Sequence, residues 1–349
     1  MKAQSVSTYA LNNSLRSVVS KAQAELLKAQ KEATTGTVFD VGLALGSRSS
    51  QTISLRKEYD RLTSLSDMNK LTGERMKTSQ TAISDVIKES QKYLANLTGA
   101  TSTPEGKNAI VQSAKAGLQT MTGLLNSSFN GEYIFSGVNT DVKPVADYYA
   151  DGSTARASVQ QAFEDHFGFG MDDPQVAGIT GEQMTEFLDG AFADAFSEAN
   201  WSENWSQASS DVIKSRIAPT ELAETSVSAN DSGFRKAAMS FAMVAELGGI
   251  GLSDGAFNAL VDKALTSTTE AITGVSQSQS TLGIAQDRTN SANTRIAAQL
   301  NILNSSVLDL EAVDPYEAAT RVNALTSQIE SSYAMTTRLM GLSLLNYLK

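Results

Sequence analysis

The sequence predicts a mainly α-helical protein, in which long antiparallel helices from the N- and C-terminal segments form a coiled-coil rod that carries a small mixed α/β inserted domain. The first observation is a seven-residue repeat, which is typical of a helix that keeps one seam against a partner. The repeat consists of residues one heptad apart: Val261, Thr268, Val275, Leu282, Thr289, Ile296, Leu303 and Leu310. The second is that only 5 of the 349 residues are proline, a composition that favours long uninterrupted helices.

A second stripe, near the N-terminus, predicts a helix from about Ser5 to Thr34 that ends near Gly36. Its members recur every three or four residues: Leu11, Leu15, Val18, Ala22, Leu26, Ala29 and Ala33. The stripe is rich in alanine, so this helix is marginal in water when it stands alone. We therefore expect it to become ordered when the chain assembles with partners.

Two further helices are expected before residue 130. The first follows a glycine-containing loop at residues 41–46 and has a heptad seam: Leu62, Leu65, Asn69, Thr72, Met76, Ser79, Ile83, Val86, Ser90, Tyr93 and Leu97. The second begins at Thr103-Pro104-Glu105, which combines a capping hydroxyl, a first-turn proline and a first-turn carboxylate. We expect that helix to reach about Phe129, and the glycine-flanked run at residues 131–137 to form a brief strand and turn.

Residues 141–235 differ in composition from the rest of the chain. They contain 17 acidic and 5 basic residues, a net charge of −12, whereas the remainder carries +2. They also hold seven of the 12 phenylalanines, both tryptophans and the only histidine, which indicates a small acidic inserted domain. Because the chain has no basic stripe to displace phosphate counterions, we expect neither a nucleic acid nor a membrane as a partner.

Helical periodicity returns near Phe234 and predicts one helix that closes at Gly248-Gly249, followed by a long helix from about Ser253 to Leu310. Asp314-Pro315-Tyr316-Glu317 then predicts the start of the last helix, because it combines an N-cap carboxylate, a first-turn proline and a glutamate. The heptad face and the tip of this helix contain Val322, Leu325, Ile329, Ser332, Thr336, Leu339, Leu342, Leu344, Leu345, Tyr347 and Leu348. A free monomer rarely leaves such an apolar tip in water.

These elements divide the chain into three parts. Residues 1–36 and 312–349 contain the terminal helices, residues 37–140 and 236–311 contain the long helices between them, and residues 141–235 form the acidic inserted domain. The expected assembly interface lies on the two terminal helices: Leu11, Leu15, Val18, Ala22, Leu26, Val322, Leu325, Ile329, Leu339, Leu342, Leu345, Tyr347 and Leu348.

The sequence offers little for catalysis. His166 lies near Asp172 and Asp173, but no nucleophile or second base is arranged with them, so we expect a surface or loop histidine. Trp201 and Trp205 could form a ligand-stacking face, although such a pair is more often the core of a small domain. The chain has no cysteine, which excludes disulfides and thiolate metal sites. We expect no enzyme, no cofactor and no metal.

Three segments together resemble the bacterial flagellar axial proteins, and most closely the hook-associated protein 3 family of hook–filament junction proteins. They are the polar start at residues 1–5 that leads into the N-terminal stripe, the Gly-Glu-Tyr-Ile-Phe-Ser-Gly segment at residues 131–137, and the Leu-Ser-Leu-Leu-Asn-Tyr-Leu ending at residues 342–348. One segment departs from many relatives: Phe-Asp-Val-Gly-Leu-Ala-Leu-Gly at residues 39–46 replaces a loop of the Ser-Asp-Asp-Pro type.

The resemblance implies a structural subunit that joins the hook end to the flagellin filament. It implies that residues 1–36 and 312–349 pair as an inner-tube assembly domain, that residues 37–140 and 236–311 form a helical rod, and that residues 141–235 form an outer domain. It implies self-association in a ring or helical assembly, contact with flagellin and with another hook-associated junction protein, and a flagellar export chaperone on the C-terminal helix. It also implies an extracellular location in the flagellum, reached through the flagellar type III apparatus without a cleaved signal peptide. Two alternatives stay open: flagellin itself, which shares the paired terminal helices, and a cytoplasmic coiled-coil scaffold.

Overall fold

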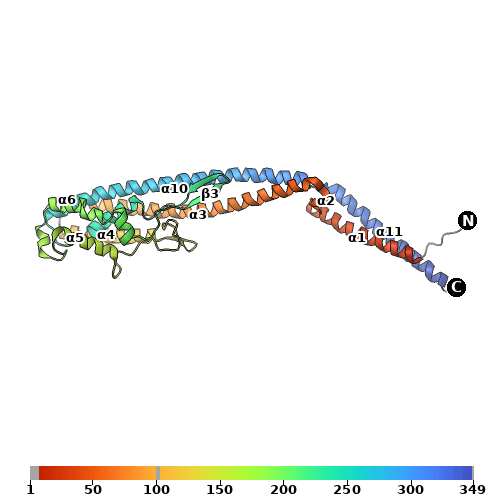
Figure 1. The fold of residues 1–349 in the computed structure, drawn as a ribbon, viewed down its shortest axis with the longest axis horizontal. Helices are drawn as coiled ribbons and strands as arrows, with labels where there is room; N and C mark the ends of the chain where they lie inside the picture. The colour runs from red at the N-terminus through yellow and green to blue at the C-terminus, as the bar shows by residue number, and fades with distance from the viewer. Residues whose placement is uncertain (1–7, 100–102, 348–349) are drawn as a thin grey trace. The chain divides into compact units, whose positions relative to one another are not determined.

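The computed structural model describes residues 8–99 and 103–347, with side chains described from residue 13 to residue 338 within those ranges. Long helices dominate, and the two small sheets each have two strands, so the mainly α prediction is confirmed (Figure 1). Backbone contacts divide the chain into two compact units. The terminal unit joins residues 1–64 to residues 297–349, and the central unit comprises residues 65–296. The three predicted domains, which use other boundaries, stay a prediction.

Two long helices, α3 (Ser49–Thr98) and α10 (Asp254–Glu311), run through both units. Within the central unit they are antiparallel neighbours, because the amide of Asn69 donates to the Asn293 side chain at 3.0 Å while the amide of Gln80 donates to the Gln279 carbonyl at 2.9 Å. The heptad prediction for α10 is confirmed where Thr268, Val275, Leu282, Thr289 and Ile296 are buried. The alternate seam positions are small residues: Ala264, Ala271, Ser278, Ala285 and Ala292. Small side chains there let the neighbouring helices approach closely.

Two shorter helices, α4 (Pro104–Leu125) and α9 (Ser232–Leu247), pack on each other in the central unit. The N-cap predicted for α4 is present, because the Thr103 hydroxyl accepts from the Gly106 amide. The helix was expected to reach Phe129 but ends at Leu125. The reason is tertiary: the Asn126 side chain donates to the Val145 carbonyl at 2.9 Å and accepts from the Val145 amide at 3.0 Å.

The next residues form β1 (Ser128–Phe129) and β2 (Glu132–Tyr133), an antiparallel hairpin. Its turn uses Asn130 at φ 53° and Gly131 at φ 86°, the left-handed pair that a tight two-residue hairpin turn requires. The predicted strand at residues 131–137 is therefore reduced to two residues. Ile134 and Phe135, which follow it, are fully buried in the core instead.

The acidic segment folds into α5 (Thr154–Phe167), η2 (Pro174–Gly178), α6 (Gly181–Asp189), α7 (Ala191–Asp194), α8 (Glu198–Asn204), β3 (Lys214–Ala218) and β4 (Glu221–Glu224). Its aromatic side chains belong to, or pack against, one buried cluster that also includes residues of α4, α9 and α10. Trp201 and Trp205 stack at 5.0 Å between ring centroids, and the Trp201 indole donates to the Asn230 side chain. The expectation that both tryptophans form core is confirmed by their burial.

The β3–β4 hairpin lies on the α3 and α10 pair. The Asn69 amide donates to the Ile217 carbonyl at 2.7 Å, and Arg288 donates to the Glu221 carboxylate and the Leu222 carbonyl, each at 3.1 Å. These contacts explain why a short hairpin of mainly polar residues is stable, since an isolated two-strand hairpin is marginal in water.

The terminal unit is built from α1 (Thr8–Thr35), α2 (Val41–Leu45), η1 (Gly46–Arg48), the start of α3, the end of α10 and α11 (Pro315–Tyr347). α1 and α11 pack along each other, as Figure 1 shows in red and blue. Among the described residues, no helix combines the length and apolar character needed to span a bilayer.

Candidate assembly interface

The seam between α1 and α11 is thin. Among the described residues, its buried members on α1 are Ala22 and Ala29, and those on α11 are Ala318 and Ile329. Around them lie half-buried residues at heptad spacing: Leu15, Leu26, Val322, Leu325, Ser332 and Thr336. Burial stabilises in proportion to the apolar area removed from water. Because three of the four buried residues are alanines, this seam alone stabilises the two helices only weakly.

The predicted interface residues fall into three groups. Ala22 and Ile329 are buried in the seam, and Leu15, Leu26, Val322 and Leu325 are half-buried beside it. Val18 is 41% exposed, whereas its neighbour Val19 is half-buried. Leu11, Leu339, Leu342, Leu345 and Tyr347 belong to α1 or α11 but lie outside the residues whose side chains are described, and Leu348 lies outside the described residues. Their role in assembly stays a prediction.

The outward faces of both helices carry large apolar side chains. Leu27 on α1 is 67% exposed, and Tyr333 and Met335 on α11 are 52% and 61% exposed. Together with Val18, they surround the thin seam with apolar surface that the two helices do not bury. Such surface marks an interaction site more often than a solvated face.

A short backbone connection fixes the end of the α1–α11 pair. Thr37 and Ala312 form an antiparallel bridge, with the Val38 amide donating to the Glu311 carbonyl and the Val313 amide donating to the Gly36 carbonyl, both at 2.9 Å. Segments that are far apart in sequence thus meet at residues 36–38 and 311–313. The bridge holds the C-terminal end of α1 close to the N-terminal end of α11.

An ion pair lies next to this bridge. The Arg56 Nε donates to a carboxylate oxygen of Glu311 at 3.0 Å, and its Nη2 donates to the other. The Glu311 side chain is buried, whereas the Arg56 side chain is 58% exposed. The hydrogen bond to Glu311 raises the pKa of the Arg56 guanidinium above its ordinary value. Loss of Arg56 would leave a buried carboxylate without its charged partner, which is costly.

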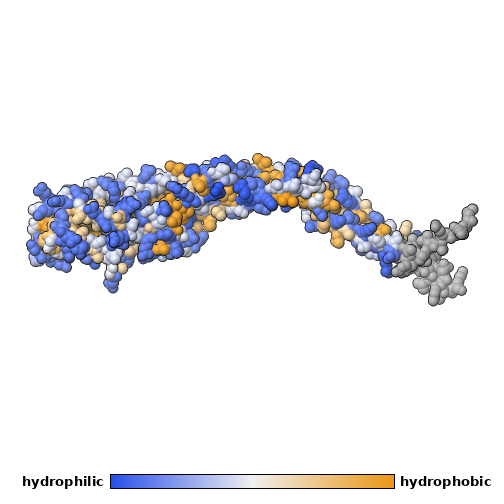
Figure 2. All heavy atoms as spheres, viewed as in Figure 1, coloured by the Kyte–Doolittle hydropathy of each residue, from blue (hydrophilic) through white to orange (hydrophobic). Residues whose placement is uncertain are grey.

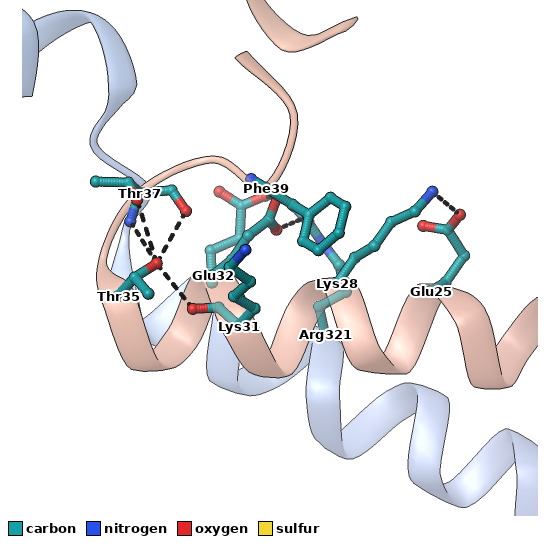
Figure 3. Close-up of polar contacts among 9 residues, drawn as sticks. Glu25, Lys28, Lys31, Glu32, Thr35, Thr37, Phe39 and Arg321 are labelled. Carbon is teal, nitrogen blue, oxygen red and sulfur yellow. Dashed lines mark hydrogen bonds and ion pairs between the residues drawn. The ribbon is translucent and has the colours of Figure 1, made fainter.

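Glu32 connects three segments of the terminal unit (Figure 3). Its Oε1 accepts from the Phe39 amide at 3.0 Å, and its Oε2 accepts from Arg321 of α11 at 3.1 Å. Lys31 places its ammonium 4.9 Å from the centroid of the Phe39 ring. Glu32 and Arg321 cannot be recognised as a pair from the sequence, because a charged pair 289 residues apart leaves no periodic signal. A hydrogen bond also connects the two terminal helices: the Gln23 amide of α1 donates to the Tyr333 hydroxyl of α11 at 3.0 Å.

The candidates for other chemistry do not form a site. His166 is exposed and contacts the rings of Phe167 and Phe187. In the part of the chain that the structure describes, no cluster of three or more His, Asp or Glu side chains is placed to hold a metal ion. The candidate functional surface is the exposed apolar surface of α1 and α11 described above.

Comparison with known proteins agrees with this architecture. Residues 6–140 match the family model of the bacterial flagellin N-terminal helical region, and residues 265–348 match that of the bacterial flagellin C-terminal helical region. The chain therefore belongs to the flagellin-like family of flagellar structural proteins, which is not a family of enzymes.

A solved structure gives a second likeness. A Vibrio parahaemolyticus protein assigned as a flagellar hook-associated protein aligns with a TM-score of 0.52 and 11% sequence identity, over 76% of this chain and 97% of that one. At this identity the likeness shows the fold alone. The comparison with curated proteins gives no significant match.

Proposed function

We propose that this flagellar structural subunit joins the end of the hook to the flagellin filament, through helix packing of its termini. The observation that supports the proposal is that the α1–α11 pair buries little of its own apolar surface. Its seam buries mainly alanines, while Val18, Leu27, Tyr333 and Met335 stay exposed. Copies arranged around and along a tube would cover these faces by heterologous contacts, which generate rings or helices.

The partners that we propose come from the resemblance to the hook-associated proteins. One side of the assembly contacts another hook-associated junction protein and the other side contacts flagellin. Before export, a flagellar chaperone covers the apolar C-terminal helix in a groove, a common mode of helix recognition. Export as an unfolded chain through the type III apparatus would place the subunit outside the cell without a cleaved signal peptide.

Deletion of the gene in the source bacterium tests the junction role. We expect hooks without filaments, and flagellin lost to the medium, because filament subunits would lack the surface on which they assemble. Electron microscopy of the cells and immunoblots of the medium measure both outcomes. Normal filaments on the deletion strain would contradict the proposal, and restoration by the plasmid-borne gene is the control.

Truncation from Leu339 onward tests the role of the C-terminal helix. This change removes the apolar tip but leaves Ala318 and Ile329, the described buried residues of α11, in place. We expect loss of both chaperone binding and incorporation into flagella. The full-length chain is the control for pull-down with the chaperone and for immunoblots of sheared flagella, and normal filaments on cells that make only the truncated chain would contradict the prediction.

The alternatives predict other results. If the chain is flagellin, the purified protein should extend long filaments from seeds by itself, whereas a junction subunit should cap or join without extension. If it is a cytoplasmic scaffold, the intact chain should be absent from sheared flagella.

A further inference from the structure

The turn of the β1–β2 hairpin consists of Asn130 and Gly131, which are both exposed. Asn-Gly occurs once in the sequence. Glycine has no Cβ atom to shield its own backbone nitrogen, and that nitrogen can attack the side-chain carbonyl carbon of a preceding asparagine. The reaction also consumes water. Figure 2 shows that most of the visible surface is hydrophilic, and an exposed turn on such a surface is in contact with water.

The two reacting groups are free of protein partners. Within the described residues, neither the Asn130 side chain nor the Gly131 backbone amide forms a hydrogen bond to another protein group. A Cβ atom added at Gly131 would meet no other atom within 4 Å, so the turn is not crowded. Asn126 differs, because both ends of its side-chain amide are bonded to the Val145 backbone. Asn130 therefore keeps the freedom to rotate that the reaction needs, whereas Asn126 does not.

The hairpin can open at its tip without disturbing the core. It contains only two residue pairs, and a short two-stranded hairpin is marginal by itself. Ile134 and Phe135, which follow the second strand, are fully buried and anchor it. Elements with few buried contacts open locally at a low free energy. Opening of the tip lets the turn leave its left-handed conformation and bring the backbone nitrogen to the side-chain carbonyl carbon.

We propose that Asn130-Gly131 is a self-modification site, at which Asn130 converts into aspartate and isoaspartate without an enzyme. The Gly131 nitrogen forms a bond to the Asn130 Cγ atom, the bond from Cγ to Nδ2 breaks, and Nδ2 leaves as ammonia with the proton of the Gly131 amide. The product is a cyclic imide. Water then breaks one of the two carbonyl bonds to the imide nitrogen. Cleavage at Cγ gives aspartate, and cleavage at the main-chain carbonyl carbon gives isoaspartate.

The two products differ in their effect on the hairpin. Aspartate tolerates the left-handed conformation of this position, so the turn is kept. Isoaspartate continues the backbone through its side-chain carbon and adds an atom to the turn, which changes the loop geometry that the hairpin requires. Arg75 donates to the Glu132 carboxylate and to the Tyr133 carbonyl, both at 3.3 Å. Isoaspartate should weaken these contacts, because they depend on the position of β2.

Peptide mass spectrometry of the purified full chain tests the proposal. Samples are incubated in mildly alkaline buffer, either folded or in urea, and are digested at successive times. Isoaspartate is identified by its labelling with protein isoaspartate methyltransferase. We expect Asn130 to convert in both samples and to yield isoaspartate, with no detectable conversion of Asn126 in the folded chain over the same period. The proposal is overturned if Asn130 converts no faster than Asn126 in the folded chain, or if it stays intact even in urea.

Gly131→Asn is the matched variant. Asparagine tolerates a positive φ and the added Cβ atom has room, so circular dichroism melting should match that of the natural chain. The Cβ atom nevertheless shields the backbone nitrogen. We expect the conversion of Asn130 to slow several-fold, and equal rates in the two chains would overturn the proposal.

Hydrogen exchange tests the effect on the hairpin. The Tyr133 amide donates to the Thr140 carbonyl at 2.8 Å, and the Ile134 amide donates to the Ser127 carbonyl at 3.1 Å. Both amides should exchange faster in chains that contain isoaspartate, whereas Asn130→Asp should leave their exchange unchanged. Equal exchange in all three chains would overturn the effect assigned to isoaspartate. These experiments use the purified chain, so their outcome is independent of the proposed function.

Discussion

The backbones of α9 and α10 touch where Gly233 faces Gly274. A Cβ atom on Gly274 would lie 2.8 Å from the Gly233 Cα atom, closer than two carbon atoms can pack. Since both positions belong to helices, neither backbone can move aside alone. We expect Gly274→Ala to lower the free energy of unfolding by about 1–2 kcal/mol, because overpacking costs more than the gain in helix propensity.

Gly283→Ala is the matched control for this change. Gly283 lies on the same helix, but its added Cβ would meet only the Gln80 amide, at 3.5 Å, so we expect stabilisation of up to about 1 kcal/mol. Urea unfolding followed by tryptophan fluorescence measures both variants, since both tryptophans lie in the central unit. Equal effects of the two variants would show that the glycine contact is unimportant.

Tyr93 gives the central unit a dependence on alkaline pH. Its side chain is buried and its hydroxyl donates to the Ser240 carbonyl at 3.2 Å. Burial raises the pKa of Tyr93 above the ordinary value of about 10. The folded state therefore keeps the proton after the unfolded state has lost it. The stability contribution is complete below pH 10 and decreases as the pH rises toward the folded pKa.

The expected loss from Tyr93 is about 1.4 kcal/mol by pH 11. Unfolding free energies of the natural chain and of Tyr93→Phe, compared at pH 8 and pH 11, measure it. The variant should lose less stability between the two pH values by about that amount. An identical loss in both proteins would mean that Tyr93 ionises in the folded state as readily as in the unfolded one.

The packing of α11 on α1 is stabilised by the burial of few apolar side chains. Ile329 is the one large apolar residue buried on α11 within the described side chains. We expect Ile329→Ala to cost about 2 kcal/mol, the lower end for deletion of a buried aliphatic side chain. The loss should fall on the terminal unit. Met335→Ala, which changes a residue that is 61% exposed on the same helix, should have little effect.

Two optical signals can separate the units in this experiment. Circular dichroism at 222 nm reports on helices of both units, whereas tryptophan fluorescence reports on the central unit alone. Unfolding of the terminal unit should therefore give a transition in circular dichroism that fluorescence does not show. Ile329→Ala should lower the melting temperature of that transition. A shift of the fluorescence transition by the same amount would mean that the units unfold together.

The long elements could be predicted from sequence because their signals are local. The heptads of α3 and α10, the Thr103 cap and the Asp314-Pro315 start all depend on residues within one or two helical turns. The end of α4 could not be predicted, because it depends on the contact of Asn126 with Val145. The β3–β4 hairpin was missed for the same reason, since its polar strands are held by Asn69 and Arg288.

The candidate interface could be predicted only in outline. Apolar periodicity identified both terminal stripes, and Ala22 and Ile329 are buried as a seam requires. Periodicity does not show which of two adjacent residues is covered by the partner helix: it predicts Val18 for the interface, although Val19 is the more buried of the two. Glu32 and Arg321 meet across 289 residues, and such a contact requires the fold itself.

The two units of the whole molecule differ in how complete their cores are. Among the described residues, the buried apolar side chains of the terminal unit are Ala22, Ala29, Leu62, Ala318 and Ile329. The central unit buries both tryptophans and a continuous cluster of aromatic and aliphatic residues. Regions with few buried apolar contacts open with low free energies. The central unit thus has a continuous hydrophobic core, whereas the described part of the terminal unit buries few apolar side chains.

Amide hydrogen exchange should therefore distinguish the two units in a dilute monomer. We expect residues 13–35 and 315–338 to exchange much faster than α4, α9 and the central part of α10, because isolated helices with little burial are marginal. In isolated flagella the same terminal helices should become as protected as the central unit, since neighbouring copies would cover Leu27, Tyr333 and Met335 in the proposed assembly. The dilute monomer and the flagellar sample are compared in the same buffer. Equal protection of both units in the monomer would mean that the α1–α11 pair is complete alone, and assembly would then need another source of free energy.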